Sequence, residues 1–253
     1  MDSCHSNDKA IQHCYRIHPT KRVYSGAFRN EQGDRRNAVS LSINTYSCKS
    51  EVQCRSCLRC CNNGCDSGRA FSKLALEMFN KHVPYDQIHY FELERSFDLD
   101  AEQYEQFMRR GHEPEILLSF DATPGAAETI NEWISCGHDV SIITGRPSSV
   151  YELSRIWLDE HGLKNARLYC LNKYGRDYFI KNSNSTLELE DYYRMKFDYA
   201  VEDSPKAFRF FEHLPELKVL VFDRPWNRDC AFPNENYQRC ADWESIRKIV
   251  TGE

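Results

Sequence analysis

The sequence predicts an α/β fold in which a Rossmann-like parallel sheet is joined to a small helical insertion. From Thr123 to the end of the chain, helical and strand-like patterns alternate as they do in strand–helix–strand units. The region 68–110 differs, because Phe71, Leu74 and Met78 are at helical spacing and no strand-like segment follows them. We therefore expect a helical segment followed by an α/β core.

The elements of the core can be predicted in order along the chain. The first helix is expected between Thr123-Pro124, a cap followed by proline at the first helical position, and Gly137. A later helix begins at the capping box of Ser149 and Glu152. The other elements are strands at 139–143, 167–171, 197–201 and 218–222, and helices around 187–195, after 204 and at 242–250. Parallel units of this kind bind ligands at the carboxyl ends of their strands.

The composition narrows the classes of partner. A chain of 253 residues with 41% hydrophobic content can bury a sizeable core. Its net charge of −5 gives no electrostatic reason to expect a nucleic-acid polymer or an anionic membrane as partner. No apolar run approaches the ~20 residues that span a bilayer, and residues 1–10 lack the layout of a secretory signal. We expect a cytoplasmic protein that binds a small anionic ligand; the oligomeric state is not predicted.

Cysteines are concentrated near the start of the chain, with eight of the twelve in the first 65 residues. A disulfide scaffold is typical of short secreted chains with a deficient core, so we expect free thiols or a metal instead. The spacing that suits a metal best is that of Cys54, Cys57, Cys60 and Cys65. It does not match iron–sulfur runs. A zinc-binding interaction module, with Cys48 or Cys61 as substitute ligands, remains an alternative.

A candidate phosphate-binding group follows the strand predicted at 139–143. Thr144, Gly145 and Arg146 bring a hydroxyl, a flexible backbone amide and a guanidinium to the start of a helix. Such donors bind phosphoryl oxygens, and the helix end adds favourable partial charge. The alternative is that Thr144 only caps the helix and Gly145 only forms the turn.

Two further strand ends supply a cation and two carboxylates. Lys173 follows the strand at 167–171, where an ammonium can neutralise a carboxylate nucleophile and a phosphate together. Glu202 and Asp203 follow the next strand, and Mg²⁺ often takes only one or two protein carboxylates. Taken singly, Lys173 could be solvated and Asp203 could cap a helix.

The order of these three motifs resembles that of the haloacid-dehalogenase-like hydrolase superfamily, and the tail Leu220–Asn227 is similar to its 5'-deoxyribonucleotidase and nucleotidase-like branch. The resemblance extends from about residue 68 to the end. It implies a Rossmann-like core at 117–253 and a helical cap at 62–116 that covers the site and selects the substrate. It also implies Mg²⁺-dependent hydrolysis of phosphomonoesters, by a phosphatase or 5'-nucleotidase acting on small metabolites such as nucleoside monophosphates.

The resemblance also implies roles for individual residues. They are Thr144 and Lys173 as catalytic residues, Gly145 and Arg146 as substrate-binding residues, and Glu202 and Asp203 as Mg²⁺ ligands. Thr144 would hydrogen-bond the phosphoryl group. Lys173, with Lys181 as a substitute, would hold the nucleophile and the phosphate. Among the aromatic residues of the insertion, Tyr90, Phe91 and Phe97 could stack on a base, but we expect them to pack the cap's own core.

The nucleophile of the family reaction is missing from this pattern. The reaction needs an aspartate at the end of the first core strand and a second one two residues later. Aligning Asp66-Ser67 with the aspartate–serine that closes the family's first motif places Arg59 and Cys61 at those two positions. Neither side chain can form an acyl phosphate. The segment 53–61 is also rich in cysteine and arginine, so no core strand is predicted there.

Two hypotheses account for the missing motif. Codons chosen for residues 56–61, read one base later, can encode Arg-Val-Phe-Val-Ala-Val, which is typical of a buried strand. Residues 1–61 would then be an irregular segment from a shifted frame or a mis-assigned start. The other hypothesis is a catalytically silent protein that binds phosphate or a nucleotide and has lost its nucleophile.

Overall fold

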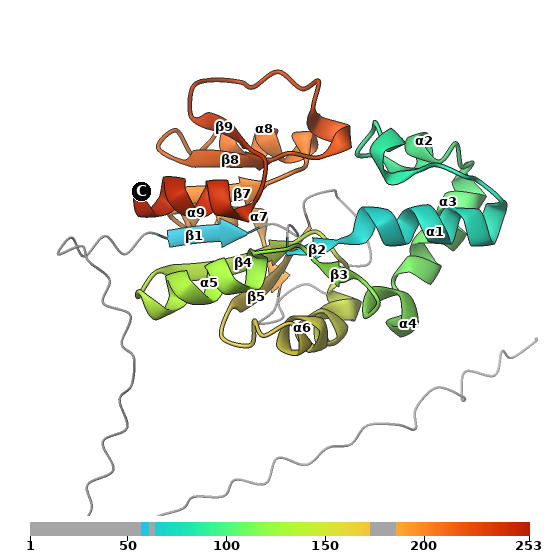
Figure 1. Ribbon diagram of the computed structural model, residues 1–253, viewed down its shortest axis with the longest axis horizontal. Coiled ribbons are helices and arrows are strands. Elements are labelled where there is room, and N and C mark those ends of the chain that lie inside the picture. The colour runs from blue at the N-terminus through green and yellow to red at the C-terminus, as the bar shows by residue number, and fades with distance from the viewer. Residues whose placement is uncertain (1–56, 61–63, 173–185) are drawn as a thin grey trace, which may run out of the picture. The chain divides into compact units, whose positions relative to one another are not determined.

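The computed structural model describes residues 57–60, 64–172 and 186–253. Its central feature is a seven-stranded sheet, in which all paired strands are parallel (Figure 1). In spatial order the strands are β6 (Thr186–Leu187), β5 (Arg167–Leu171), β4 (Asp139–Thr144), β1 (Cys57–Cys60), β7 (Tyr199–Glu202), β8 (Lys218–Phe222) and β9 (Tyr237–Cys240). The predicted α/β fold with a parallel sheet is confirmed.

Helices cover both faces of this sheet, and successive side chains of each strand face opposite layers. On β8, Leu220 packs in a cluster with Trp133 and Trp243, whereas Val221 packs in the other cluster with Tyr192. The first cluster takes side chains from α5 (Ala126–Ser135), α6 (Tyr151–Glu160) and α9 (Trp243–Thr251). The second takes them from α7 (Leu189–Arg194) and α8 (Phe208–Phe211). Burial on both faces explains the near-continuous apolar runs.

Strand β1 lies at the centre of the sheet, between β4 and β7. Arg59 pairs there with Ser141 on one side and Ala200 on the other. The expectation that no core strand lies within 53–61 was therefore wrong. Hydrogen bonds to two neighbouring strands set its place, whereas its cysteine and arginine residues do not form the apolar, β-branched run by which a strand is recognised.

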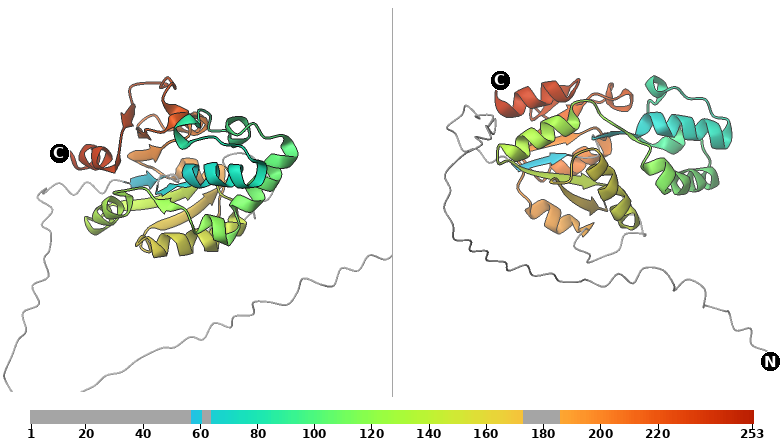
Figure 2. Two further views of the ribbon diagram at one scale, coloured as in Figure 1. Left: turned by 45° about the vertical axis from the view of Figure 1, so that its right-hand side comes forward. Right: turned by 60° about the horizontal axis from the view of Figure 1, so that its bottom comes forward.

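The helical segment lies between two short antiparallel strands, β2 (Cys65–Asp66) and β3 (Asp121–Ala122). It consists of α1 (Ser67–Phe79), η1 (Tyr85–Gln87), α2 (Leu93–Ser96), α3 (Ala101–Gly111) and α4 (Pro114–Leu117). These helices have a hydrophobic core of their own, built around Leu74, Phe97 and Phe107. They gather beyond the end of the sheet toward which β1 points (Figures 1 and 2). This segment, called the cap below, therefore faces the carboxyl ends of the strands.

Local chemistry fixes the ends of the cap helices. Asp100 accepts a hydrogen bond from the backbone of Gln103, and the Gln103 side chain accepts one from Asp100, so a capping box begins α3. Asn80 ends α1 in the left-handed conformation, with φ of 54°. None of the helices in the described ranges is long and apolar enough to cross a membrane.

Candidate functional site

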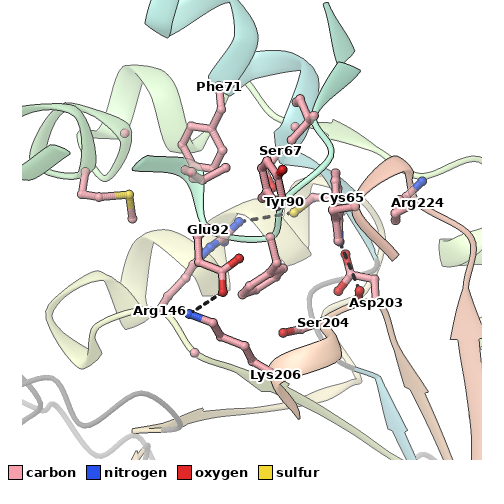
Figure 3. Close-up of a pocket in the computed structure, with 18 of the residues that line it drawn as sticks. Cys65, Ser67, Phe71, Tyr90, Glu92, Arg146, Asp203, Ser204, Lys206 and Arg224 are labelled. Carbon is pink, nitrogen blue, oxygen red and sulfur yellow. Dashed lines mark hydrogen bonds and ion pairs between the residues drawn. The ribbon is translucent and has the colours of Figure 1, made fainter. Parts of the chain in front are cut away.

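A cavity of about 290 Å³ lies between the cap and the carboxyl ends of β4, β7 and β8. The core contributes polar residues to its lining, including Gly145, Arg146, Glu202, Asp203, Lys206 and Arg224. The cap contributes mainly apolar and aromatic side chains, among them Phe71, Ile88, Tyr90 and Phe91. The cavity thus has a charged floor and an apolar roof (Figure 3).

The Thr-Gly-Arg motif lies at the end of β4, as predicted. Gly145 and Arg146 line the cavity. The Arg146 guanidinium donates hydrogen bonds to Sγ of Cys65 at 3.3 Å and to Oγ of Ser154 at 3.4 Å. Thr144 is 2% exposed and its Oγ1 accepts a hydrogen bond from the Arg146 backbone at 3.2 Å. Thr144 lines a small adjoining cavity rather than the main one.

The acidic pair follows β7 and its two members have different surroundings. Glu202 is 1% exposed, and its Oε1 accepts hydrogen bonds from the backbone amides of Asp203 and Ser204, both at 3.1 Å. The Asp203 carbonyl oxygen accepts hydrogen bonds from Nε1 of Trp226 at 3.1 Å and from Nδ2 of Asn227 at 3.0 Å. Glu202 therefore holds the backbone of the loop that follows β7. The loop after β8 holds Asp203 at the cavity.

The acidic pair fits Mg²⁺ only as part of a larger ligand set. Within the described ranges, no group of three or more His, Cys, Asp or Glu side chains could hold a metal ion. Mg²⁺ commonly completes its octahedron with water and substrate phosphate around one or two carboxylates. Asp203 lines the cavity, while Glu202 Oε1 is bound to backbone amides. The donors thus suit an ion that arrives with a phosphorylated ligand.

The two predicted lysines, Lys173 and Lys181, lie outside the described residues. The same holds for Cys48, Cys54 and Cys61 of the zinc alternative. Another lysine, Lys206, lines the cavity, and its Nζ lies 2.7 Å from Oε1 of Glu92 on the cap. Burial would raise the pKa of Glu92, but the hydrogen bond from Lys206 and further favourable interactions outweigh it and lower that pKa. This ion pair connects the cap to the core at the cavity wall.

The residues around the missing nucleophile include a thiol and a carboxylate. Cys65 lines the cavity, and its burial raises the pKa of the thiol, so that it is neutral at neutral pH. Asp66 also lines the cavity and forms an ion pair with Arg69 at 3.0 Å. Arg59 lies within β1, whose last residue is Cys60. No aspartate therefore ends the described part of the first core strand.

The aromatic residues of the cap divide between two roles. Phe97 is fully buried, with its ring centroid 5.6 Å from that of Phe107, as expected for a residue of the cap's core. Tyr90 and Phe91 instead line the cavity, so the expectation that they only pack the cap was wrong. The Arg95 guanidinium lies 3.5 Å from the centroid of the Tyr90 ring. Tyr90 is 39% exposed, as expected for a residue at the rim of the cavity.

Sequence reasoning also missed Arg224, which follows β8 and lines the cavity. The same rule that found Arg146 could have found it, because both arginines lie just beyond a buried parallel strand. Lys206 was missed because it lies one turn beyond the acidic motif, within a short helix at Pro205–Ala207.

Comparison with known proteins supports this architecture. No family model matches the chain. "Putative nucleotidase BH1399" of Halalkalibacterium halodurans is 24% identical over 152 residues, covering 60% of this chain and 71% of that protein. "Putative nucleotidase OB0422" of Oceanobacillus iheyensis is 22% identical over 170 residues, covering 66% and 83%. Both names belong to the branch that the resemblance implied.

Solved structures lead to the same fold. A structure described as a predicted phosphoglycolate phosphatase from Haemophilus somnus is 14% identical and covers 77% of this chain and 97% of its own, with a TM-score of 0.50. The chain shares the fold of that structure. A haloacid-dehalogenase-family hydrolase from Deinococcus radiodurans, solved with phosphate and sodium, covers 78% of this chain and 95% of its own at 12% identity and a TM-score of 0.49. The resemblance to nucleotidase-like proteins that the sequence implied agrees with the two relatives named as nucleotidases.

Proposed function

We propose that the protein is a phosphomonoester hydrolase of the haloacid-dehalogenase type that acts, with Mg²⁺, on small phosphorylated metabolites such as nucleoside monophosphates. The observation that carries this proposal is the cavity itself. It brings cations, a carboxylate and backbone donors together at the carboxyl ends of parallel strands, under an apolar cap. Its similarity to two proteins named as nucleotidases supports the same substrate class.

The residues of the floor have complementary tasks in this proposal. Gly145 and Arg146 donate hydrogen bonds to phosphoryl oxygens, since both line the cavity just after β4. Thr144 lies beside them: its Oγ1 accepts a hydrogen bond from the Arg146 backbone, and its hydroxyl proton would donate to the phosphate. Asp203 is the carboxylate that would hold Mg²⁺, and the ion, when bound, neutralises charge on the phosphoryl group. Lys173, which lies outside the described residues, keeps its proposed task of holding the nucleophile and the phosphate.

The roof of the cavity suits an apolar, flat leaving group. Phe71, Tyr90 and Phe91 present aromatic rings to the space above the charged floor. Stacking on a base is worth about 1–3 kcal/mol per aromatic residue in nucleic-acid-binding proteins. A nucleoside therefore fits this roof better than a small hydrophilic alcohol does, and the closed cap excludes bulk water from the phosphate.

One observation favours a second candidate, a protein that binds nucleotides without turnover. The end of β1 and the residues after it read Cys60-Cys61-Asn62-Asn63, with no aspartate where the family nucleophile belongs. Without that carboxylate no aspartyl phosphate can form, whereas the donors for phosphate binding on the neighbouring strands are retained.

One set of measurements separates the two candidates. Release of inorganic phosphate from a panel of nucleoside monophosphates is followed with and without Mg²⁺, for the full chain and for the variants Thr144→Val and Asp203→Asn. Mg²⁺-dependent release that both variants lose supports the hydrolase. Release that neither variant changes contradicts the site assignment. Nucleotide binding in calorimetry without any release supports the silent binding protein, and absence of both excludes both candidates.

A further inference from the structure

Arg224 is a buried cation at the cavity. Arg224 is only 9% exposed and lies two residues beyond the end of β8. The guanidinium donates a hydrogen bond to Oγ1 of Thr123 at 3.3 Å and lies 4.2 Å from the centroid of the Phe222 ring. Both contacts fix the orientation of the side chain, but neither supplies a negative charge.

The carboxylate nearest to Arg224 in the sequence is used by other arginines. Asp223 forms ion pairs with Arg228 at 3.1 Å and with Arg239 at 3.2 Å. In the part of the chain that the structure describes, no carboxylate oxygen lies within 4.0 Å of the Arg224 guanidinium. An arginine cannot lose its proton in a protein, and a buried charge without a counter-ion is strongly unfavourable. Binding of an anion beside Arg224 would therefore remove an unfavourable buried charge.

The loop that carries Arg224 is held rigidly. The Arg224 backbone donates a hydrogen bond to Oδ1 of Asn227 at 3.2 Å, and Nδ2 of the same asparagine donates to the Phe222 carbonyl at 2.9 Å. Asn227 is fully buried. Because Asn227 also donates to the Asp203 carbonyl, one side chain fixes Arg224 and Asp203 relative to each other. A site fixed in this way suits recognition of a ligand better than a solvated surface arginine does.

Arg224 and Arg146 act on the same part of the cavity. Both guanidiniums lower the pKa of Cys65, against the larger effect of its burial, so both lie near that thiol. In the close-up, Cys65 and Asp203 lie between the two arginines (Figure 3). The cavity floor thus has a guanidinium on either side of the carboxylate that is proposed to hold Mg²⁺.

We propose that Arg224 binds an oxyanion of the phosphorylated substrate, as a second arginine of the site. This inference rests on the proposed function of the cavity. The oxyanion is either an oxygen of the reacting phosphoryl group or that of a second anionic group on the same substrate. Guanidinium forks match both chemically, since each offers two acceptor oxygens in a plane.

The experiment compares Arg224→Met with Arg228→Met in the full chain. Methionine keeps most of the apolar stem and removes the charge. Arg228 is a matched control on the same loop, because it is 57% exposed in its side chain and pairs with Asp223. Binding of inorganic phosphate, of a nucleoside 5'-monophosphate and of a nucleoside 3',5'-bisphosphate is measured by calorimetry at constant ionic strength, with and without Mg²⁺.

The expected result is a loss of affinity of roughly 10- to 100-fold in Arg224→Met and no comparable loss in Arg228→Met, as for removal of a charge-assisted hydrogen bond. A loss for phosphate itself assigns Arg224 to the reacting group. A loss confined to the bisphosphate assigns it to a second anionic group. Unchanged affinity for all three ligands overturns the inference while leaving the proposed function in place. If the wild-type chain binds none of the ligands, the proposed function and the inference both fail.

A second measurement avoids dependence on the fold of the variant. In the wild-type chain labelled with ¹⁵N-arginine, the Arg224 Nε resonance is assigned as the signal that Arg224→Lys removes. Saturating phosphate or nucleotide is expected to shift this signal. A signal that stays in place while the Arg146 resonance moves overturns the inference.

Discussion

Strands β1 and β8 occupy the same parallel sheet, but their sequences suit it very differently. β8 is Lys-Val-Leu-Val-Phe, and its last four residues are all buried. β1 is Cys-Leu-Arg-Cys, although it pairs with strands on both sides at the centre of the sheet. The difference teaches that residue type determines β8, whereas the topology of the fold alone determines the place of β1.

One row of residues across the sheet makes the comparison direct. Arg59 of β1 pairs with Ala200 of β7, and Ala200 pairs in turn with Val219 of β8. Ser141, the partner of Arg59 on β4, and Ala200 are both fully buried, and Val219 is 1% exposed. The same row of the sheet therefore has valine on β8 and arginine on β1.

The largest effect is expected for Val219→Arg. The substitution puts a charge into a fully buried row, where no described carboxylate pairs with it. Leaving a buried charge without a partner costs about 3–5 kcal/mol, which approaches the whole stability of a small domain. Urea denaturation followed by circular dichroism would show a chain that is largely unfolded at 25 °C. A Val219→Arg variant that retains wild-type stability would show that this row tolerates charge.

The reciprocal change, Arg59→Val, is expected to stabilise the protein. Ser141 and Ala200, the neighbours of Arg59 in this row, are fully buried, and valine suits such a strand position better than arginine by up to about 1 kcal/mol. The same denaturation experiment measures the gain. A stabilised variant also supports the shifted-frame hypothesis, because that reading places apolar residues in this strand. A loss of stability would instead show that Arg59 has a structural role. Sequencing of the coding DNA across codons 45–68 then decides whether this segment comes from a shifted reading frame or from the true one.

The buried thiols of other strands provide a smaller, pH-dependent test. Burial raises the pKa of Cys170 on β5 and of Cys240 on β9 from 9.0 to about 11. Because the folded pKa exceeds the unfolded one, this stabilisation is complete below pH 9 and is lost as the pH rises toward 11. The expected loss at pH 10 is about 1 kcal/mol for each thiol.

Urea unfolding at pH 8, 9 and 10 under reducing conditions measures that loss. The Cys170→Ala variant is expected to lose about 1 kcal/mol less than the wild-type chain between pH 8 and pH 10. Any decrease beyond that of Cys170 and Cys240 is expected to come partly from Cys65, whose thiol pKa is also raised by burial. Constant stability between pH 8 and pH 10 would contradict the prediction.

Much of the fold follows from local patterns, and the failures have physical causes. The strands predicted at 139–143, 167–171 and 218–222 match β4, β5 and β8 within one residue. The strand predicted at 197–201 begins only at Tyr199. Phe197 was included because it is apolar, and it is buried just before the strand starts. β9, at 237–240, was not predicted, since this short edge strand has polar residues, Gln238 and Arg239, at its centre and so carries a weak apolar signal.

The site was predictable where it depends on strand ends. Gly145, Arg146 and Asp203 lie at the cavity because parallel strands bring their carboxyl ends to one edge. Tyr90 and Phe91 could not be assigned from the sequence. An aromatic side chain in a helical insertion has the same pattern whether it packs the insertion or faces a cavity, and only the position of the cap against the core decides which.

The smallest effect is expected in the loop after β8, where Trp226 contacts the backbone of Asp203. Trp226→Phe removes the hydrogen bond from Nε1 to the Asp203 carbonyl together with some ring volume, and Asn227 still donates to that oxygen. The expected cost is about 0.5–1.5 kcal/mol, with a weaker apparent affinity for Mg²⁺ in the presence of phosphate.

Trp133→Phe is the matched control for this change. The Nε1 of Trp133 is buried without a hydrogen-bond partner in the described part of the chain, so phenylalanine removes no polar contact there. Both variants lose ring volume, and thermal unfolding should report a loss in both. Only Trp226→Phe should change the Mg²⁺ dependence of phosphate binding, because only Trp226 contacts the backbone of Asp203. Equal Mg²⁺ dependence in the two variants would show that Asn227 alone holds Asp203, and that the tryptophan of this loop serves packing against Tyr85 on the cap.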